Sequence, residues 1–263
     1  MESSQEYLPE QSEDIFLHTA DDTYAPSSED GDHSDDLETC KCCAHKFSCP
    51  SGVFIFGRSQ SGKSALTADI ILQRRHLFTK VPQHVIYVYS CWQEKYDHLQ
   101  QTLQGSISFR TDIPSTEELQ QLYNDSPNIH RLLVIDDKFQ AFKGGDQGRD
   151  LLQLSAVTTH HCLFTVFYIS QSIFHTNLQK EISLNCQYLI ICNNARSQQQ
   201  VRVLGSQIFG PGQLTYFADA YKKALTRRYG YLLVDIHQDT PEKYRLKSHI
   251  LKNETLIVYL PMK

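Results

Sequence analysis

One short stretch limits what this chain can fold into more than any other: Gly57-Arg58-Ser59-Gln60-Ser61-Gly62-Lys63-Ser64. Its two glycines, with Lys and Ser directly after the second, match the pattern of a phosphate-binding loop. The apolar run 52–56 before it is typical of a buried strand, and apolar residues recur at helical spacing across 64–77. A strand that enters a helix through such a loop aims backbone N–H groups and the positive helix end at one point. The sequence therefore predicts a P-loop NTPase.

We expect this loop to bind ATP together with Mg²⁺. Lys63 would reach the β- and γ-phosphates and serve in catalysis, and the Ser64 hydroxyl would bind the metal. The predicted nucleotide-binding residues are those of the whole loop: Gly57, Arg58, Ser59, Gln60, Ser61, Gly62, Lys63 and Ser64.

Two acids follow the apolar run Leu132-Leu133-Val134-Ile135. A carboxylate at the end of a buried strand faces the crevice where α/β sheets bind their ligands. We expect Asp136 to hold Mg²⁺, directly or through water, as a Walker B acid, and Asp137 to orient or deprotonate the attacking water. Many ATPases carry the longer Glu at the second position. A plain surface acidic pair therefore stays open as the alternative, above all for Asp137.

Gln171 is the third catalytic candidate, because it stands just past the predicted strand 163–169. A neutral amide there is placed to contact the γ-phosphate or the attacking water. The alternative is a polar loop residue without a catalytic role.

Apolar strands alternate with helical segments along the rest of the chain. Besides 52–56, the predicted strands are 84–89, 107–109, 131–136, 163–169, 188–192, 231–235 and 256–260. Helices are predicted after Ser115, which with Glu118 resembles a capping box, across 148–159, and from about 197. This order indicates an α/β fold whose mostly parallel sheet is covered on both faces, in one domain at 47–263.

The first part of the chain differs from the rest in composition. Residues 1–40 contain 13 of the 30 acidic residues and none of the 25 basic ones, so residues 41–263 carry eight more basic than acidic side chains. We predict that 1–46 is a disordered acidic tail with a Cys-rich end, since it holds too little apolar surface to offset chain entropy. The basic remainder favours a polyanionic partner, with an ordinary solvated surface as the alternative.

Four cysteines and a histidine lie within 40–49. They are expected to be free thiols, with a zinc site as the less favoured alternative, because no second ligand pair follows. No apolar run is long enough to span a bilayer and the start lacks signal-peptide features, so an intracellular protein without membrane contact is expected.

Several longer stretches resemble the FtsK–HerA-type genome-packaging ATPases of Maverick/Polinton elements, adintoviruses and related double-stranded DNA viruses. The resemblance runs from about Phe47 to Leu260. It rests on the segments 85–93 with 96–97, 133–137, 155–161, 168–174, 182–189 and 229–235.

The resemblance implies a RecA-like three-layer core in which Lys63, Ser64, Asp136, Asp137 and Gln171 keep the roles given above. It also implies a homo-oligomeric ring that pumps double-stranded DNA into a capsid, with capsid proteins as further partners. The expected location is the host nucleus or cytoplasm at a site of virus assembly.

Oligomeric ATPases often complete the site with an arginine from the next subunit. The residues Arg149, Arg196, Arg227 and Arg228 are all candidates, and the sequence does not rank them. A basic cluster, Lys222, Lys223, Arg227 and Arg228 with Tyr221 and Tyr229, is a candidate for DNA phosphate contacts or a solvated helix end.

Two other functions use the same loop. One is a nucleoside or small-molecule kinase, which the paired acids and the distant Gln171 make less favoured. The other is a nucleotide-dependent interaction switch with little turnover, in which the acidic tail would bind the partner.

Overall fold

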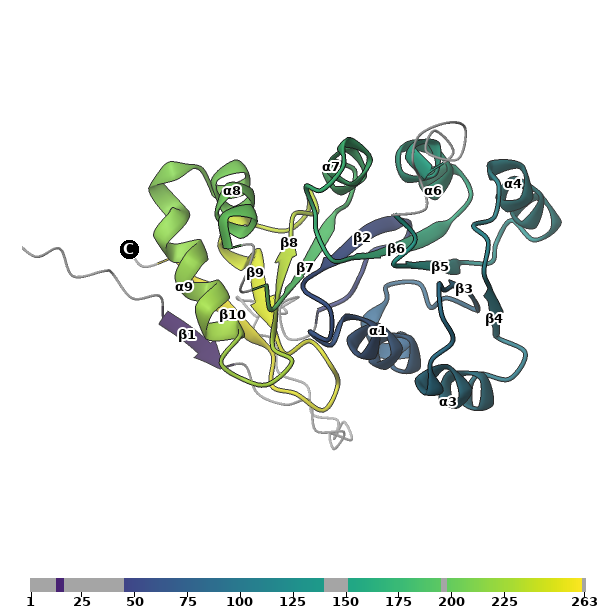
Figure 1. The fold of residues 1–263 in the computed structure, drawn as a ribbon, viewed down its shortest axis with the longest axis horizontal. Coiled ribbons are helices and arrows are strands. Elements are labelled where there is room, and N and C mark those ends of the chain that lie inside the picture. The colour runs from purple at the N-terminus through teal and green to yellow at the C-terminus, as the bar shows by residue number, and fades with distance from the viewer. Residues whose placement is uncertain (1–12, 17–44, 140–150, 195–197, 262–263) are drawn as a thin grey trace, which may run out of the picture.

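A ten-stranded sheet runs through the molecule in the order β1-β10-β9-β8-β7-β2-β6-β5-β3-β4 (Figure 1). The computed structural model describes residues 13–16, 45–139, 151–194 and 198–261. Strands β7, β2, β6, β5, β3 and β4 are parallel to one another, and β8, β9, β10 and β1 continue the sheet as antiparallel strands. The predicted α/β fold with a mostly parallel sheet is confirmed.

The strands of the sheet are β1 (Glu13–Phe16), β2 (Ser51–Phe56), β3 (His84–Val88), β4 (Ile107–Arg110), β5 (Arg131–Asp136), β6 (Phe164–Ser170), β7 (Tyr188–Cys192), β8 (Tyr231–Asp235), β9 (Leu246–Ser248) and β10 (Ile257–Leu260). The helices are α1 (Lys63–Leu72), α2 (Arg74–Leu77), α3 (Glu94–Thr102), α4 (Thr116–Asp125), the π-helix η2 (Leu154–Thr158), α6 (Thr159–His161), α7 (Asn177–Leu184), α8 (Gln198–Phe209), the 3₁₀ helices η3 (Pro211–Gln213) and η4 (Glu242–Tyr244), and α9 (Leu214–Ala224).

The core has two halves because successive side chains of a strand point to opposite faces of the sheet. In β2, Val53 and Ile55 pack in a cluster with apolar residues of α1, α2 and α3. Phe54 and Phe56 pack on the other face with residues of α4, η2, α7, α8 and α9. Figure 1 shows these two helical layers on either side of the sheet. This is the predicted three-layer arrangement.

All eight predicted strands form, and no strand end differs from its predicted position by more than one residue. The predicted helix at 64–77 is divided at Gln73 into α1 and α2, and the helix after Ser115 begins as expected, with Ser115 Oγ accepting the Glu118 N–H. The first residues of the helix predicted at 148–159 lie outside the described residues, and its remainder is helical through His161.

Two strands were not predicted. One is β9, and the other is β1, which lies within the segment expected to be an acidic tail and pairs antiparallel with β10. Strand β10 would otherwise leave a row of unpaired backbone groups at the edge of the sheet, and such an edge accepts a further strand through main-chain hydrogen bonds. Residues 1–12 and 17–44 of the expected tail lie outside the described residues.

No helix in the described ranges is both long enough and apolar enough to cross a membrane.

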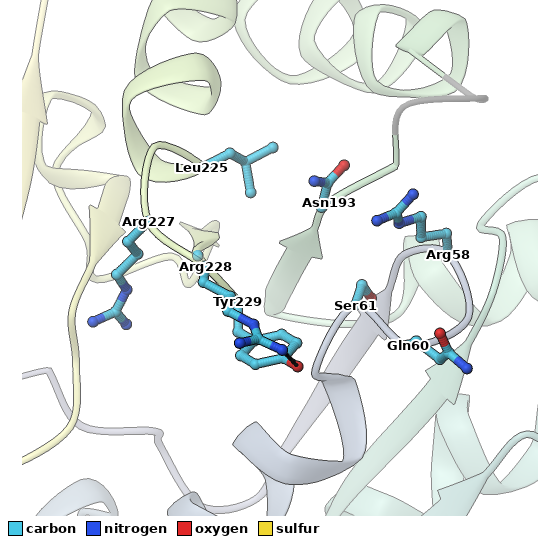
Figure 2. Close-up of a pocket in the computed structure, with 9 residues that line it drawn as sticks. Arg58, Gln60, Ser61, Asn193, Leu225, Arg227, Arg228 and Tyr229 are labelled. Carbon is cyan, nitrogen blue, oxygen red and sulfur yellow. Dashed lines mark hydrogen bonds between the residues drawn. The ribbon is translucent and has the colours of Figure 1, made fainter.

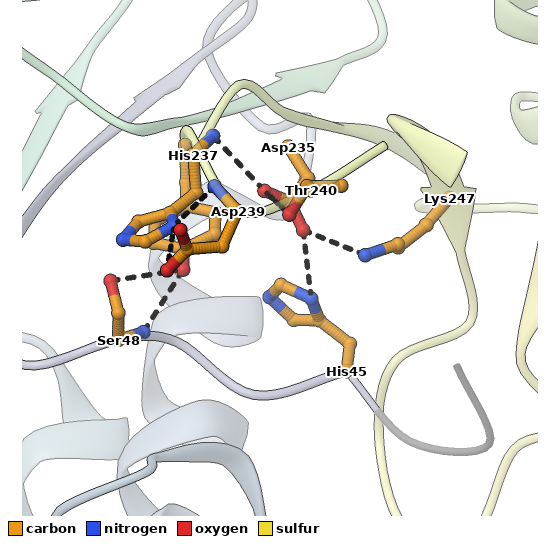
Figure 3. A network of polar contacts seen from close by, with 8 residues as sticks. His45, Ser48, Asp235, His237, Asp239, Thr240 and Lys247 are labelled. Carbon is orange, nitrogen blue, oxygen red and sulfur yellow. Dashed lines mark hydrogen bonds and ion pairs between the residues drawn. The ribbon is translucent and has the colours of Figure 1, made fainter. Parts of the chain in front are cut away.

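A buried polar network fastens the chain before β2 to the end of β8 (Figure 3). Asp235 accepts hydrogen bonds from Lys247 Nζ at 2.7 Å and from Thr240 Oγ1 at 2.9 Å. His45 lies 3.8 Å from the same carboxylate, is only 4% exposed, and packs edge-on against Phe47. Burial, and then the charge of Lys247, hold the pKa of His45 well below its usual value. Since Asp235 is already paired with Lys247, we take His45 to be neutral.

Acid should therefore weaken the fold. Below the unfolded-state pKa of about 6.5, the unfolded chain takes up a proton that the buried His45 ring does not. The free energy of unfolding should fall as the pH is lowered from 6.5, by up to about 1.4 kcal/mol per pH unit for this group. Burial also lowers the pKa of His130, to about 4. His130 should therefore lower the free energy of unfolding further as the pH falls from 6.5 to about 4. Urea unfolding at several pH values measures the slope. His45→Gln should flatten it, and an unchanged slope would contradict the assignment.

Candidate functional site

The phosphate loop joins β2 to α1 and is tied to the strands on both sides. The Gly57 N–H donates to the Ser170 carbonyl of β6 at 3.3 Å, and the Arg58 N–H donates to the Asn193 carbonyl beyond β7 at 3.1 Å. A Cβ atom on Gly57 would lie 2.8 Å from Cys192 Cβ and 2.9 Å from Ser61 Oγ. Only glycine fits this position without displacing a neighbouring strand.

The curl of the loop requires backbone conformations that L-residues rarely adopt. Gly62, directly before α1, has φ 92°, and Gln60 has φ 61°. The Ser61 N–H donates to the Arg58 carbonyl at 3.3 Å, which closes the turn. The first N–H groups of α1 have no partners within the helix and carry its positive end, so the turn produces an anion-binding cradle.

Lys63 folds back over this cradle. Its ammonium donates to the carbonyls of Gly57 and Arg58, both at 2.8 Å, and the side chain is buried, with 8% exposure. Burial lowers the pKa of Lys63, while the nearby Cys192, Asp137 and Asp136 act in the opposite direction. Lys63 therefore lies close enough to interact electrostatically with Asp136 and Asp137, the two acids predicted from the sequence. A buried cation above a ring of amides suits the phosphates of a nucleotide.

Asp136 ends β5, 5% exposed. Its Oδ2 atom accepts hydrogen bonds from Tyr87 Oη at 2.8 Å and from Tyr96 Oη at 3.2 Å. Burial, followed by the charge of Asp136, raises the pKa of both tyrosines, so they remain donors. Sequence reasoning missed Tyr87 and Tyr96. The available signal was for Tyr87: its ring carries a hydroxyl within the apolar strand β3, which lies next to β5, the strand that carries Asp136.

Asp137 occupies a different environment, because it is exposed and has φ 53°. Its N–H donates to the Ile169 carbonyl of β6, and Gln171 Nε2 donates to its carboxylate at 3.1 Å. Ser90 Oγ donates to its carbonyl, also at 3.1 Å. The structure therefore brings Asp137 and Gln171 into contact at the carboxyl edge of the sheet.

Ser64 lies in the first turn of α1, half-buried, next to Lys63. A hydroxyl and a carboxylate are oxygen ligands of the kind that Mg²⁺ prefers. Ser64 and Asp136 are the residues that would hold the metal, and the phosphate loop would hold the nucleotide.

Lys95, at the start of α3, is a further cation that sequence reasoning missed. It is half-buried, and its ammonium lies 5.6 Å from the centre of the Tyr96 ring. Burial lowers its pKa, the charge of Asp136 raises it, and the charge of Lys63 lowers it again. Lys95 therefore adds positive charge near Asp136. No motif or periodicity around Lys95 indicated this position from the sequence.

The structure places the residues of the predicted basic cluster in different environments. Tyr221 is not a surface aromatic, because its hydroxyl donates to the Cys192 carbonyl and accepts the Asn194 N–H, both at 3.3 Å. Arg227 pairs with Glu254, and Arg228 stacks on Tyr229 next to the phosphate loop. Arg149 and Arg196 lie outside the described residues. A role for any of the four arginines in a neighbouring subunit stays a prediction.

The zinc hypothesis also stays a prediction. Cys40, Cys42 and Cys43 lie outside the described residues, and within the described ranges no three His, Cys, Asp or Glu side chains gather as metal ligands. The cysteines that the structure describes, from Cys49 to Cys192, are free thiols.

No protein-family model and no curated protein sequence matches this chain. Solved structures match its fold. The genome packaging NTPase B204 of Sulfolobus turreted icosahedral virus 2, in complex with ATP-gammaS, aligns with a TM-score of 0.50 at 16% identity, over 76% of this chain and 97% of B204. B204 of Sulfolobus turreted icosahedral virus, a DNA-packaging ATPase, aligns with a TM-score of 0.49 at 13% identity, over 81% of this chain and 98% of that one.

ATPases 2 and 3 of EssC from Geobacillus thermodenitrificans align with a TM-score of 0.44 at 11% identity, over 81% of this chain and 40% of EssC. At these identities the likeness concerns the fold. The chain has an α/β fold like that of a viral packaging NTPase.

Tyr87→Phe tests whether the tyrosines hold the Asp136 carboxylate for Mg²⁺. The variant removes one hydrogen bond to a metal ligand, and losses at such supporting residues typically cost about 10–100-fold in metal affinity or activity. Mg²⁺ titration of nucleotide binding by calorimetry should show a lower Mg²⁺ affinity, so that a higher Mg²⁺ concentration is needed for half-maximal binding. Tyr89→Phe is the matched control, since Tyr89 belongs to the same aromatic group but does not contact Asp136. Equal Mg²⁺ affinities in the two variants would contradict the role.

Proposed function

We propose that this protein is an ATPase that translocates double-stranded DNA and packages a viral or virus-like genome into a capsid. The observation that carries the proposal is the meeting of three elements at one edge of the sheet. These are the phosphate loop with Lys63, the paired acids Asp136 and Asp137, and Gln171 in contact with Asp137. Each comes from a different strand or loop, so chance proximity in sequence does not explain the arrangement.

The chain's own groups divide the work of hydrolysis. The loop amides and Lys63 bind the phosphates and balance the charge that develops on them. Ser64 and Asp136 would hold Mg²⁺, and the metal when bound would neutralise negative charge on the nucleotide phosphates. Asp137, exposed and hydrogen-bonded to Gln171, orients the attacking water and accepts its proton. Gln171 holds the Asp137 carboxylate in place through its hydrogen bond. Because Gln171 directly follows β6, it would also respond to the presence or loss of the terminal phosphate.

Coupling to DNA is supported by three observations. The resemblance to packaging ATPases of Maverick/Polinton elements and related viruses runs from about Phe47 to Leu260, a range that includes β2 to β10. The fold is that of a genome packaging NTPase, B204. Residues 41–263 carry eight more basic than acidic side chains, which suits contacts to DNA phosphates. A homo-oligomeric ring with an arginine supplied in trans, and a capsid partner, belong to the same proposal.

Two substitutions test the catalytic roles. Lys63→Ala should lower ATP turnover by about 10²–10³-fold or more and weaken nucleotide binding, because it removes the buried cation from the phosphates. Asp137→Asn should leave Mg·ATP binding intact and lower turnover by about 10²–10⁴-fold, as expected for loss of a general base. Calorimetry measures binding and phosphate release measures turnover, with the exposed Lys46→Ala as the control. Normal turnover in Asp137→Asn would move the base to another residue.

DNA dependence tests the motor itself. The purified full chain should hydrolyse ATP faster with double-stranded DNA, the stimulation should fall steeply with salt, and mass measurement should detect a closed oligomer. An unchanged rate together with a monomeric protein would refute translocation. Transfer of phosphate to a nucleoside would indicate a kinase, and release of ADP over minutes or longer would indicate a switch.

A further inference from the structure

A glutamine that has no part in the mechanism above lies buried at the end of β6. Gln179 belongs to α7, and only 3% of it is exposed. Its Nε2 atom donates a hydrogen bond to Ser170 Oγ at 2.7 Å, and Ser170 is the last residue of β6. The next residue is Gln171, whose side-chain amide contacts Asp137. Gln179 therefore bonds to the immediate neighbour of a predicted catalytic side chain.

The pairing of β6 with its neighbours ends just before Gln171. Within the described residues, its register with β5 ends at Ile169 and its register with β2 ends at Ser170. The Ser170 carbonyl accepts the Gly57 N–H, which holds one side of the phosphate loop. The other side is held at Asn193, which lies across from the loop in Figure 2. Backbone pairing thus fixes the loop and stops one residue short of the catalytic amide.

Side-chain hydrogen bonds shape the turn at 170–172. Ser170 Oγ accepts the Ser172 N–H at 3.3 Å, so a serine hydroxyl closes a short turn on its own backbone. Ser172 Oγ donates to Gln200 Oε1 of α8 at 2.9 Å. The turn is therefore bonded to α7 through Gln179 and to α8 through Gln200, and Gln171 lies between the two serines.

Gln179 is itself held at the start of α7. Thr176 Oγ1 accepts the Gln179 N–H at 3.2 Å, and Gln179 Oε1 accepts the Thr176 N–H at 3.0 Å, so the two residues form a capping box. The oxygen of the side-chain amide is engaged at this cap, and its nitrogen donates to Ser170. A donor fixed in this way holds the serine hydroxyl in one position.

Packing alone does not explain an amide at this position. A buried amide costs free energy unless it is hydrogen-bonded, and an apolar side chain would fill the space without that requirement. Ile182, on the same helix, packs into the apolar core. Gln171, in contrast, is exposed, and a catalytic side chain must stay within about 0.5 Å of its productive position. The buried hydrogen bonds give this exposed side chain a fixed backbone.

We propose that Gln179 is a positioning residue that holds, through Ser170, the turn that presents Gln171. Gln200 supports the same turn from α8. The inference rests on the proposed function, because it concerns the hydrolysis assigned there to Asp137 and Gln171. It adds a contribution from α7 to a site otherwise built from the phosphate loop and the ends of β5 and β6.

Gln179→Met on the full chain tests this role, because methionine is unbranched and of similar size but lacks the amide. The pairing of β2 with β6 does not depend on the amide, so Mg·ATP affinity and KM should stay close to the wild-type values. The kcat should fall by up to about 10²-fold, as expected when a catalytic contact is displaced by about 1 Å. Calorimetry measures binding, and phosphate release measures kcat and KM.

A double-mutant cycle separates positioning from general support of the fold. If Gln179 acts through Gln171, Gln179→Met should lower kcat no further once Gln171→Ala is present, because both changes remove the same contribution. A merely structural role predicts the same loss in both backgrounds. Gln187→Met is the matched control, since Gln187 accepts the Gly52 N–H at 2.7 Å at the opposite end of β2. This control should lower thermal stability and leave kcat unchanged.

Ser170→Ala removes the same hydrogen bond from its other partner and serves as the test if Gln179→Met does not fold. Its loss of kcat should likewise disappear in the Gln171→Ala background. Equal losses in both backgrounds, or full kcat in a folded Gln179→Met variant, would overturn the positioning role and leave the proposed ATPase standing. Wild-type protein that does not hydrolyse ATP would overturn the proposed function and this inference together.

Discussion

The site depends on the way the backbone of 57–63 is held between two strands. Hydrogen bonds from Gly57 to Ser170 and from Arg58 to Asn193 tie the loop to β6 and β7, and Lys63 caps it from above through the Gly57 and Arg58 carbonyls. The hydrogen-bond partners of the buried Lys63 ammonium are two neutral carbonyls, which do not neutralise its charge, so it still attracts an anion. The loop is thus preorganised for a phosphate chain, and the rest of the sheet positions the acids and Gln171 relative to it.

The two adjacent acids show how one short segment supplies two chemistries. Asp136 is buried and held by two tyrosine hydroxyls, which suits a fixed ligand. Asp137 has turned into the left-handed backbone region and faces solvent, where it touches only the amide of Gln171 among the predicted catalytic side chains. Neighbouring carboxylates in contrasting environments are a recurring way of separating structural from proton-transfer roles.

Much of this could be predicted from sequence because the signals are local. The strands are short apolar runs, and the loop, the acids and Gln171 each follow such a run directly. The supporting residues could not be predicted, because their roles arise from tertiary contacts. Tyr87 and Tyr96 read as core aromatics, Lys95 as a surface charge, and Tyr229 as part of a basic cluster. The β9 strand has three residues, too few for a period to be recognised.

The tight turn between α9 and β8 constrains how far the end of α9 can lie from the phosphate loop. Backbone N–H groups of Leu225 and Thr226 bond to carbonyls of the last turn of α9, and Gly230 bonds to Arg227. A Cβ atom on Gly230 would lie 2.2 Å from the Ala224 carbonyl, so the turn has no slack. A side chain at position 230 would therefore push the end of α9 away from the start of β8. Since Tyr229 also packs against Gly62, the turn fixes the distance between the phosphate loop and the last turn of α9, which carries Lys222 and Lys223.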